Sequence, residues 1–462
     1  MVRRSGPLAQ VVLLLWVVWL RQSTFAPAFV PEGDANWLLL GQRTLLGFVP
    51  YTETLTHAGP LQVAMATLWV GLWGSASLWA LKVAATVATF GIGLVVNVWY
   101  AEGKLGRSTV LPGLLATAGL SLPTGFLELR ALALEVPLAL VVVAQLALLT
   151  ESRSARWPLF FRLGLLLGAL LLWHLRLVPM VLLALFVLYR LTDFRLPRTL
   201  TLLGGFLPWL VLVFCAGWAS RGFGAWLHYT LYEPLTFVLQ TPWRWSGIGT
   251  WAGLVTGLWV GLVVAGWFFF RLRYFRLPIR ARSTEGLLLV WALFSLLYLA
   301  ATPPSSRSAA TGVFFLLAGG YGPFLLNEAL GNRLRRVLRA ATVALLVLVP
   351  AIGLLNPGPQ APAVAPVVPA GAWVWAEGVP AQVLWLQRWQ PANPDLRPAG
   401  VARPTPADQL RFRALAAYPP AWLVLPPPTG LGLTTEFPFL RQQYQPAVAQ
   451  SPTWHVWVRR PM

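Results

Sequence analysis

Residues 31–61 read PEGDANWLLLGQRTLLGFVPYTETLTHAGPL, and this stretch is the most informative part of the chain. It is a polar interruption between an N-terminal apolar segment and the next apolar run, and it contains Glu32, Asp34, Glu53 and His57. Because the whole chain has only 15 acidic residues, three of them this close together mark a candidate site. Carboxylates beside apolar helices suit general-base chemistry or metal binding.

The composition predicts an integral-membrane protein. Of the 462 residues, 57% are hydrophobic and 11% are charged, and the mean hydropathy is +0.65. A soluble domain of this size does not need so much apolar sequence. The aromatic residues, 13% of the chain, fit belts at two membrane interfaces. Cys215 is the single cysteine, so an intrachain disulfide is excluded.

The net charge of +20 would also suit a nucleic-acid-binding protein. However, nearly all the basic residues are arginines in short loops between apolar runs, and only Lys82 and Lys104 are lysines. That distribution is typical of the signal that orients a membrane protein, so we expect membrane lipid and no nucleic acid as a partner.

About eleven apolar runs are candidates for transmembrane helices. They are residues 8–28, 77–99, 109–126, 134–150, 159–173, 177–190, 199–218, 248–270, 285–301, 311–327 and 340–355. Residues 61–74 are also apolar, and we expect them to form a helix in the outer interface, because a full span there would invert every later loop.

The charges between these runs predict the orientation. With the N-terminus in the cytoplasm, the cytoplasmic segments hold Arg3, Arg4, Lys104, Arg107, Arg153, Arg156, Arg162, Arg190, Arg195, Arg198, Arg271, Arg273, Arg276, Arg280, Arg282, Arg333, Arg335, Arg336 and Arg339. The outer loops are poor in bases and hold Glu32, Asp34, Glu53, Glu128, Glu135 and Glu233. This positive-inside pattern predicts a multi-pass protein of the plasma or inner membrane.

The two ends of the chain differ from its middle. Arg3 and Arg4, an apolar run and Ala26-Pro27-Ala28 would also suit a signal peptide, but we expect a retained first span, because the polar loop after it must be tied to the membrane. We divide the rest into a transmembrane domain over 1–355, a Pro/Ala-rich linker over 356–370 and a small extracytoplasmic α/β domain over 371–462.

That C-terminal domain shows no catalytic motif, so we expect a lid or an acceptor-binding appendage. The segments AWVWA, AQVLWLQ, AWLVLPP and WHVWVRR predict strands, and residues 406–418 predict a helix.

The first outer loop resembles that of the GT-C class of membrane glycosyltransferases. This class includes protein O-mannosyltransferases and bacterial aminoarabinose transferases, which take sugars from polyprenyl phosphates. The matching residues are Asp34, Arg43 nine positions later, Gly47, Pro50, Tyr51, Glu53, His57, Pro60 and Leu61. Ala35 replaces a usual second acid and Ala58 replaces a usual lysine.

The resemblance continues through roughly the first 190 residues. Glu135-Val136-Pro137-Leu138 matches a second acidic motif before a span, with Glu128 and Arg130 upstream. Gly168 and His174 match the spacing from a glycine to a lysine that meets the donor phosphate, and Arg176 follows. The C-terminal half matches only in general plan.

The resemblance implies an all-α polytopic fold of the GT-C kind. The apolar runs and the change in composition give this fold about eleven transmembrane helices, interfacial helices and the small C-terminal α/β domain. The resemblance implies transfer of a sugar from a polyprenyl phosphate to an extracytoplasmic glycan, lipid or protein. One direct displacement would invert the anomeric carbon. Asp34 would be the base that deprotonates the acceptor, and Glu135 the second catalytic acid.

Cations are needed for the departing phosphate, and arginine suits it because its planar fork binds two oxygens. The candidate substrate-binding residues are Glu32, Arg43, Tyr51, Glu53, His57, Glu128, Arg130, His174, Arg176, Arg244 and Arg307. Asp34, His57 and Glu135 are candidate ligands for Mg²⁺ or Mn²⁺, although members without a metal exist in the class.

Other interpretations stay open at this point. Glu32 and Asp34 could cap a helix over 36–46, Glu135 could complement a helix dipole, and Glu53 and His57 could be ordinary loop residues. His174 and Arg176 could anchor a helix at the interface, while Glu233 has too little context to assign.

A transporter or lipid-linked glycan flippase is the non-enzymatic alternative, although such proteins usually place charges within their spans and show internal repeats. A glycan polymerase or ligase is another, but these rely mainly on arginines in a large outer loop. The sugar, the acceptor and the lipid length are not specified by the sequence.

Overall fold

The computed structural model covers residues 1–462 and describes 7–26, 29–54, 56, 58–102, 110–121, 128–151, 157–173, 178–191, 196–220, 223–228, 232, 340, 344, 368–370, 372–376, 381–391, 419–425, 443–447 and 455–460. The chain divides into two compact units. Unit 1 comprises Met1–Ala26, Trp79–Val213 and Val238–Gly358, and unit 2 comprises Pro27–Leu78, Phe214–Phe237 and Pro359–Met462.

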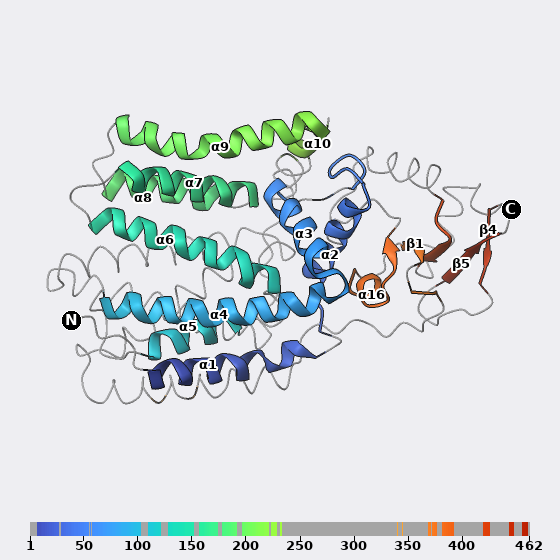
Figure 1. The fold of residues 1–462 in the computed structure, drawn as a ribbon, viewed down its shortest axis with the longest axis horizontal. Coiled ribbons are helices and arrows are strands. Elements are labelled where there is room, and N and C mark those ends of the chain that lie inside the picture. Colours follow the sequence, from blue (N-terminus) through green and yellow to red (C-terminus); the bar gives the residue numbers. More distant parts are fainter. Residues whose placement is uncertain are drawn as a thin grey trace. The chain divides into compact units, whose positions relative to one another are not determined.

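Unit 1 contains the long apolar helices. Its described elements are α1 (Pro7–Arg21), η1 (Gln22–Phe25), α4 (Ser77–Glu102), α5 (Leu111–Ser121), the π-helical turn η3 (Ala131–Glu135), α6 (Val136–Glu151), α7 (Trp157–Trp173), α8 (Val178–Leu191) and α9 (Leu196–Ser220). Figure 1 shows α1, α4, α6, α7 and α9 running roughly along one direction. Such alignment is expected of helices that share a bilayer.

Three stretches are long and apolar enough to cross a membrane: Pro7–Phe25, Pro60–Val98 and Leu196–Cys215. Shorter apolar helices cover Leu111–Leu120, Ala131–Leu146 and Trp157–Trp173. The described residues therefore confirm a mostly helical membrane protein, with helices where the first seven apolar runs predict them. The runs from 248 to 355 lie almost wholly outside the described residues, so the total of eleven spans stays a prediction.

Helix α9 has an exposed apolar face that suits contact with lipid. Leu200, Leu203, Leu207, Leu210 and Phe214 recur every three or four residues and are each more than half exposed. This spacing places them on one face of the helix. In water such a stripe would drive association, whereas lipid tails satisfy it.

Glycines allow the helices of unit 1 to come into close contact. A Cβ at Gly164 in α7 would meet the backbone of Leu202 in α9, and a Cβ at Gly205 would meet the carbonyl oxygen of Phe161 in α7. Likewise, a Cβ at Gly113 in α5 would meet the backbone of Gly93 in α4. Small residues let the backbones of membrane helices approach, and dispersion between them replaces the missing hydrophobic force.

We expect Gly205→Ala to lower the free energy of unfolding of the purified protein in detergent by about 1–3 kcal/mol, because the added methyl group would clash with the α7 backbone. Gly204→Ala is the matched control, since a Cβ there meets open space. Equal melting temperatures for the two variants, measured by tryptophan fluorescence, would show that α7 and α9 are not in close contact.

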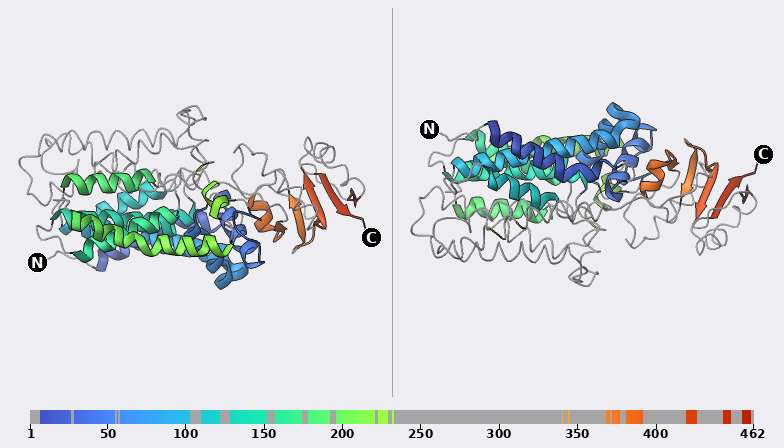
Figure 2. Two further views of the ribbon diagram at one scale, coloured as in Figure 1. Left: turned by 90° about the horizontal axis from the view of Figure 1, so that it is seen from above. Right: turned by 90° about the horizontal axis from the view of Figure 1, so that it is seen from below.

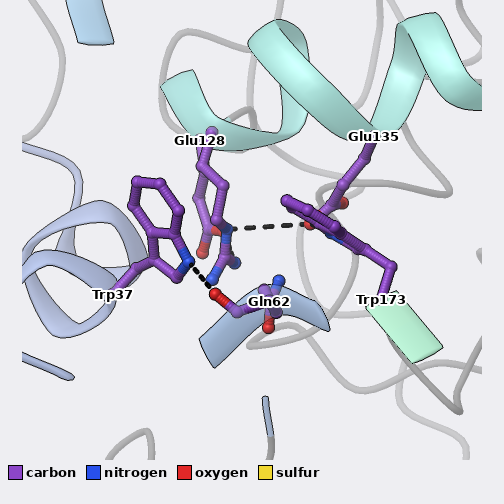
Figure 3. A network of polar contacts seen from close by, with 6 residues as sticks. Trp37, Gln62, Glu128, Glu135 and Trp173 are labelled. Atoms are coloured by element: carbon purple, nitrogen blue, oxygen red, sulfur yellow. Dashed lines mark hydrogen bonds and ion pairs between the residues drawn. The ribbon is translucent and has the colours of Figure 1, made fainter. Parts of the chain in front are cut away.

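Unit 2 begins with the helical pair that carries the first loop. It contains α2 (Glu32–Leu45), α3 (Pro60–Trp73), η2 (Gly74–Ala76) and the short α10 (Phe223–Leu227). A Cβ at Gly41 of α2 would meet the backbone of Ala66 of α3, so the two helices are in close contact. The buried indole N–H of Trp37 donates to the carbonyl oxygen of Gln62 at 3.0 Å, which fixes the pairing (Figure 3).

Helix α3 agrees with the helix predicted over 61–74. It buries Val63, Ala66 and Val70 and exposes Leu68 and Leu72. An apolar helix with one buried and one exposed apolar face suits a membrane environment. Its location in the outer interface stays a prediction.

The rest of unit 2 contains a five-stranded sheet. Its strands are β1 (Trp373–Ala376), β2 (Gln390–Pro391), β3 (Trp422–Leu425), β4 (Tyr444–Pro446) and β5 (His455–Arg459), in the order β2-β1-β3-β5-β4. β1 pairs in parallel with β2 and β3, whereas β5 pairs antiparallel with β3 and β4. Figure 2 shows this sheet from two sides.

The sequence prediction for this sheet was right for β1, β3 and β5 and wrong for residues 381–387. The segment AQVLWLQ forms the helix α16 (Ala381–Leu386) and not a strand. Val383 and Leu384 are adjacent and both buried, as a helix face allows, whereas consecutive residues of a strand point to opposite faces. The helix predicted over 406–418 lies outside the described residues.

One apolar core joins the two parts of unit 2. Helix α16 packs against α2. The buried residues of this core are Val30, Ala35, Leu39, Leu40, Tyr51, Ala58, Val63, Val368, Val374, Val383, Leu384, Trp389, Val424 and Val456. The first loop and the C-terminal sheet are therefore held together by common apolar burial. The boundaries proposed from sequence at 355 and 370 stay predictions.

Candidate active site

Asp34 lies in the first turn of α2 and is fully buried. The N-cap residue of α2 is Pro31, which makes no side-chain capping hydrogen bond. Capping is therefore not the role of Asp34 or of the exposed Glu32, and α2 begins four residues earlier than the predicted helix over 36–46. The backbone N–H groups of a first helical turn favour negative charge, and Asp34 is shielded from solvent within that turn.

Arg43 lies near the end of the same helix and is 1% exposed. Its Nε donates to Thr54 Oγ1 at 3.0 Å, and its Nη2 donates to the carbonyl oxygen of Glu53 at 3.3 Å. The guanidinium carbon lies 4.2 Å from the centre of the Phe48 ring. Burial lowers the Arg43 pKa to about 10, partly offset by the charge of Glu53, so the side chain stays a cation at neutral pH.

These contacts make Arg43 a positioning residue of the loop that follows α2. The sequence spacing suggested substrate binding for Arg43, but spacing does not reveal which groups a side chain contacts. A substrate role for Arg43 stays a prediction.

The loop between α2 and α3 is tightly built. Gly47 has a φ of 92°, and Tyr51 has a φ of 70°, which is unusual for an aromatic residue. The backbone N–H of Val49 donates to Glu53 Oε2 at 2.7 Å, and the Tyr51 hydroxyl donates to the carbonyl oxygen of Ala58 at 2.8 Å. Burial raises the pKa of Tyr51 well above its ordinary value. Strained backbone of this kind persists only where the surroundings fix it.

Glu135 forms a second polar cluster, in unit 1. It ends the π-helical turn η3 and is 3% exposed. The indole N–H of Trp173 donates to Glu135 Oε1 at 2.7 Å, and Nε of Arg130 lies 3.6 Å from the same oxygen. Arg130 also forms an ion pair with Glu128, so one guanidinium lies beside two carboxylates.

Trp173 was missed by the sequence analysis. It is the last residue of an apolar helix and looks like an ordinary aromatic there. A buried indole N–H needs an acceptor, and this requirement was the available signal. The π-helical turn was missed as well; such turns are frequent at functional sites because they re-aim the side chains around them.

Several candidate residues cannot be placed. His57, His174, Arg176, Glu233, Arg244 and Arg307 lie outside the described residues. Asp34 belongs to unit 2 and Glu135 to unit 1, so their convergence on a common cavity stays a prediction.

The described side chains do not by themselves suit a metal ion. Among them, no three His, Cys, Asp or Glu side chains gather into a ligand set. Arg130 already lies beside Glu135, and a guanidinium disfavours a second cation at the same carboxylate. The ligand set of Asp34, His57 and Glu135 depends on His57 and stays a prediction.

No family model and no curated protein matches the chain by sequence. Among solved structures, the crystal structure of ArnT from Cupriavidus metallidurans in the apo state matches with a TM-score of 0.50 at 15% identity. The match covers 99% of this chain and 100% of that one. ArnT is an aminoarabinose transferase of the GT-C class. This chain has the GT-C fold. The GT-C fold class expected from the first outer loop is thereby confirmed, while the number of spans stays a prediction.

Within the GT-C fold, we expect Arg43→Lys to destabilise the first loop. An ammonium group cannot reproduce the planar fork that reaches Thr54 and the Glu53 carbonyl, so the free energy of unfolding should fall by about 1–3 kcal/mol. Thermal unfolding in detergent measures this loss. Arg162→Lys, at an exposed arginine of α7, is the control and should leave the melting temperature unchanged. A melting temperature for Arg43→Lys equal to that of the control would contradict the structural role of Arg43.

Proposed function

We propose that the protein is an integral-membrane glycosyltransferase that moves a sugar from a polyprenyl phosphate to an extracytoplasmic glycan, lipid or protein. The observation that carries the proposal is the fully buried Asp34 in the first turn of α2, at the position where the loop resembles the catalytic loop of GT-C enzymes. The fold shared with ArnT supports it. The charge pattern supports a site on the outer face, with the N-terminus in the cytoplasm and the C-terminal domain outside.

In the proposed reaction, Asp34 accepts the proton of the acceptor hydroxyl or amine. The acceptor heteroatom forms a bond to the anomeric carbon while the bond from that carbon to the phosphate oxygen breaks. The electron pair of the broken bond leaves with the polyprenyl phosphate, which needs no proton to depart. One displacement through an oxocarbenium-like transition state inverts the anomeric centre.

The remaining residues have binding and orienting roles in this proposal. His174, Arg176, Arg244 and Arg307 pair with the phosphate as it gains charge. Arg130 and Trp173 hold Glu135 in one orientation, so that its carboxylate is aligned with the sugar before the reaction begins.

The test is transfer in detergent from a panel of radiolabelled polyprenyl phosphosugars to lipid, glycan and peptide acceptors, with and without EDTA. Label in a new product, with inverted anomeric configuration by NMR, supports the proposal, and the EDTA arm decides on a metal. If no donor is consumed and an intact lipid-linked glycan crosses the membrane of vesicles that contain the protein, a flippase is favoured instead.

Asp34→Asn is expected to lower kcat by about 10²–10⁴-fold, because the amide cannot accept the proton of the acceptor. Donor binding, measured by equilibrium dialysis with a labelled polyprenyl phosphate, should be retained. Glu151→Gln, at the last residue of α6, is the control for loss of an acidic residue and should keep full turnover. Near wild-type turnover of Asp34→Asn would remove Asp34 from the role of base.

Trp173→Phe is expected to lower kcat roughly tenfold to a hundredfold, because the ring is kept but the N–H that orients Glu135 is lost. Trp209→Phe is the matched control in the same unit, since its indole N–H donates to the carbonyl oxygen of Leu165 and not to a carboxylate. Steady-state kinetics and melting temperature are measured for both. If the two variants lose turnover only in proportion to their stability, Trp173 has no specific role.

A further inference from the structure

The C-terminal domain and the helix that carries Asp34 have a common core. Ala35, directly after Asp34, is buried in the same cluster as Val374 of β1 and Val383 of α16. Leu39, one turn further along α2, belongs to that cluster as well. A lid that opens and closes would not place the interior of its sheet against the helix it covers, because each opening would expose that core to water.

A stack of three side chains extends this contact into the loop after α2. The guanidinium of Arg43 lies over the Phe48 ring at 4.2 Å, and the Phe48 ring lies parallel to the indole of Trp373, with centroids 5.6 Å apart and planes 12° apart. Trp373 is the first residue of β1. A cation over one ring and a second ring nearly parallel to the first restrict each other's positions.

The stack connects the sheet to the backbone of the loop. Arg43 binds Thr54 and the carbonyl oxygen of Glu53, so its position sets the position of that end of the loop. Trp373 is therefore linked through Phe48 and Arg43 to Glu53, which in turn accepts the N–H of Val49. In sequence these residues are more than three hundred positions from Trp373.

We infer that the C-terminal domain is a positioning element of the transferase site, acting through the Trp373–Phe48–Arg43 stack. This inference rests on the proposed function. Trp373 acts here as a positioning residue: it holds the first loop in the geometry in which Asp34 and the loop meet the substrate. The C-terminal domain then has a role in catalysis and is not an independent lid.

Trp373→Leu tests this inference, because leucine keeps an apolar side chain and removes the stacking face. We expect a kcat roughly tenfold lower with the donor KM changed by less than about twofold, because a displaced loop affects the reaction geometry more than donor affinity. Amide hydrogen exchange should rise over residues 43–54. Trp373→Phe keeps a flat ring and should restore most of both properties.

Two further variants separate positioning from loss of stability. Trp457→Leu removes a half-buried tryptophan from β5, which is separated from β1 by β3, and should leave exchange over 43–54 at the wild-type level. Phe48→Leu breaks the stack from the loop side. It should show the same lower kcat and the same rise in amide hydrogen exchange over 43–54, and it tests the inference independently if Trp373→Leu folds poorly.

The outcomes also separate this inference from the proposed function. Unchanged exchange over 43–54 in both Trp373→Leu and Phe48→Leu, or an equal rise in Trp457→Leu, overturns the inference while transfer by the wild type stands. Absence of transfer by the wild type from every donor overturns the proposed function, and the exchange measurements then still decide whether the stack positions the loop.

Discussion

A buried guanidinium is the constraint on which the first loop depends. Arg43 is 1% exposed, and a charge removed from water is tolerated only when hydrogen bonds and polarizable groups replace its hydration. Thr54, the Glu53 carbonyl and the Phe48 ring supply that replacement, so the loop must close around Arg43 in one conformation. The left-handed backbone of Tyr51 is consistent with a loop shaped by this requirement.

The helices of unit 1 obey a different rule, because lipid offers no hydrophobic force to press them together. Glycines at the contacts of α7 with α9 and of α4 with α5 let backbones meet, and leucines on α9 face outward. Two buried polar side chains of unit 1 illustrate the pairing: Asn97 Oδ1 accepts the N–H of Gly113, and Lys82 donates to the carbonyl oxygen of Ala26. Unit 1 is thus held by shape and by a few buried hydrogen bonds.

Much of the fold could be predicted from sequence, because apolar runs and a polar loop are local patterns. The loop motif from Asp34 to Leu61 indicated the GT-C fold at an identity where family comparison finds nothing. Contacts between residues far apart in the sequence could not be predicted. AQVLWLQ has the composition of a strand but forms a helix that packs against α2. Arg43, Trp173 and Trp373 have contacts that no local spacing encodes.

The two candidate acids lie in different environments, and this difference favours different roles. Glu135 already accepts an indole N–H and lies beside the Arg130 guanidinium, so its negative charge is compensated within the protein. A carboxylate held in this way is well suited to orient a substrate and poorly suited to take a proton, since protonation would remove the attraction to Arg130. The role of aligning the sugar therefore suits Glu135, and Asp34, buried in the first turn of α2, remains the proposed base.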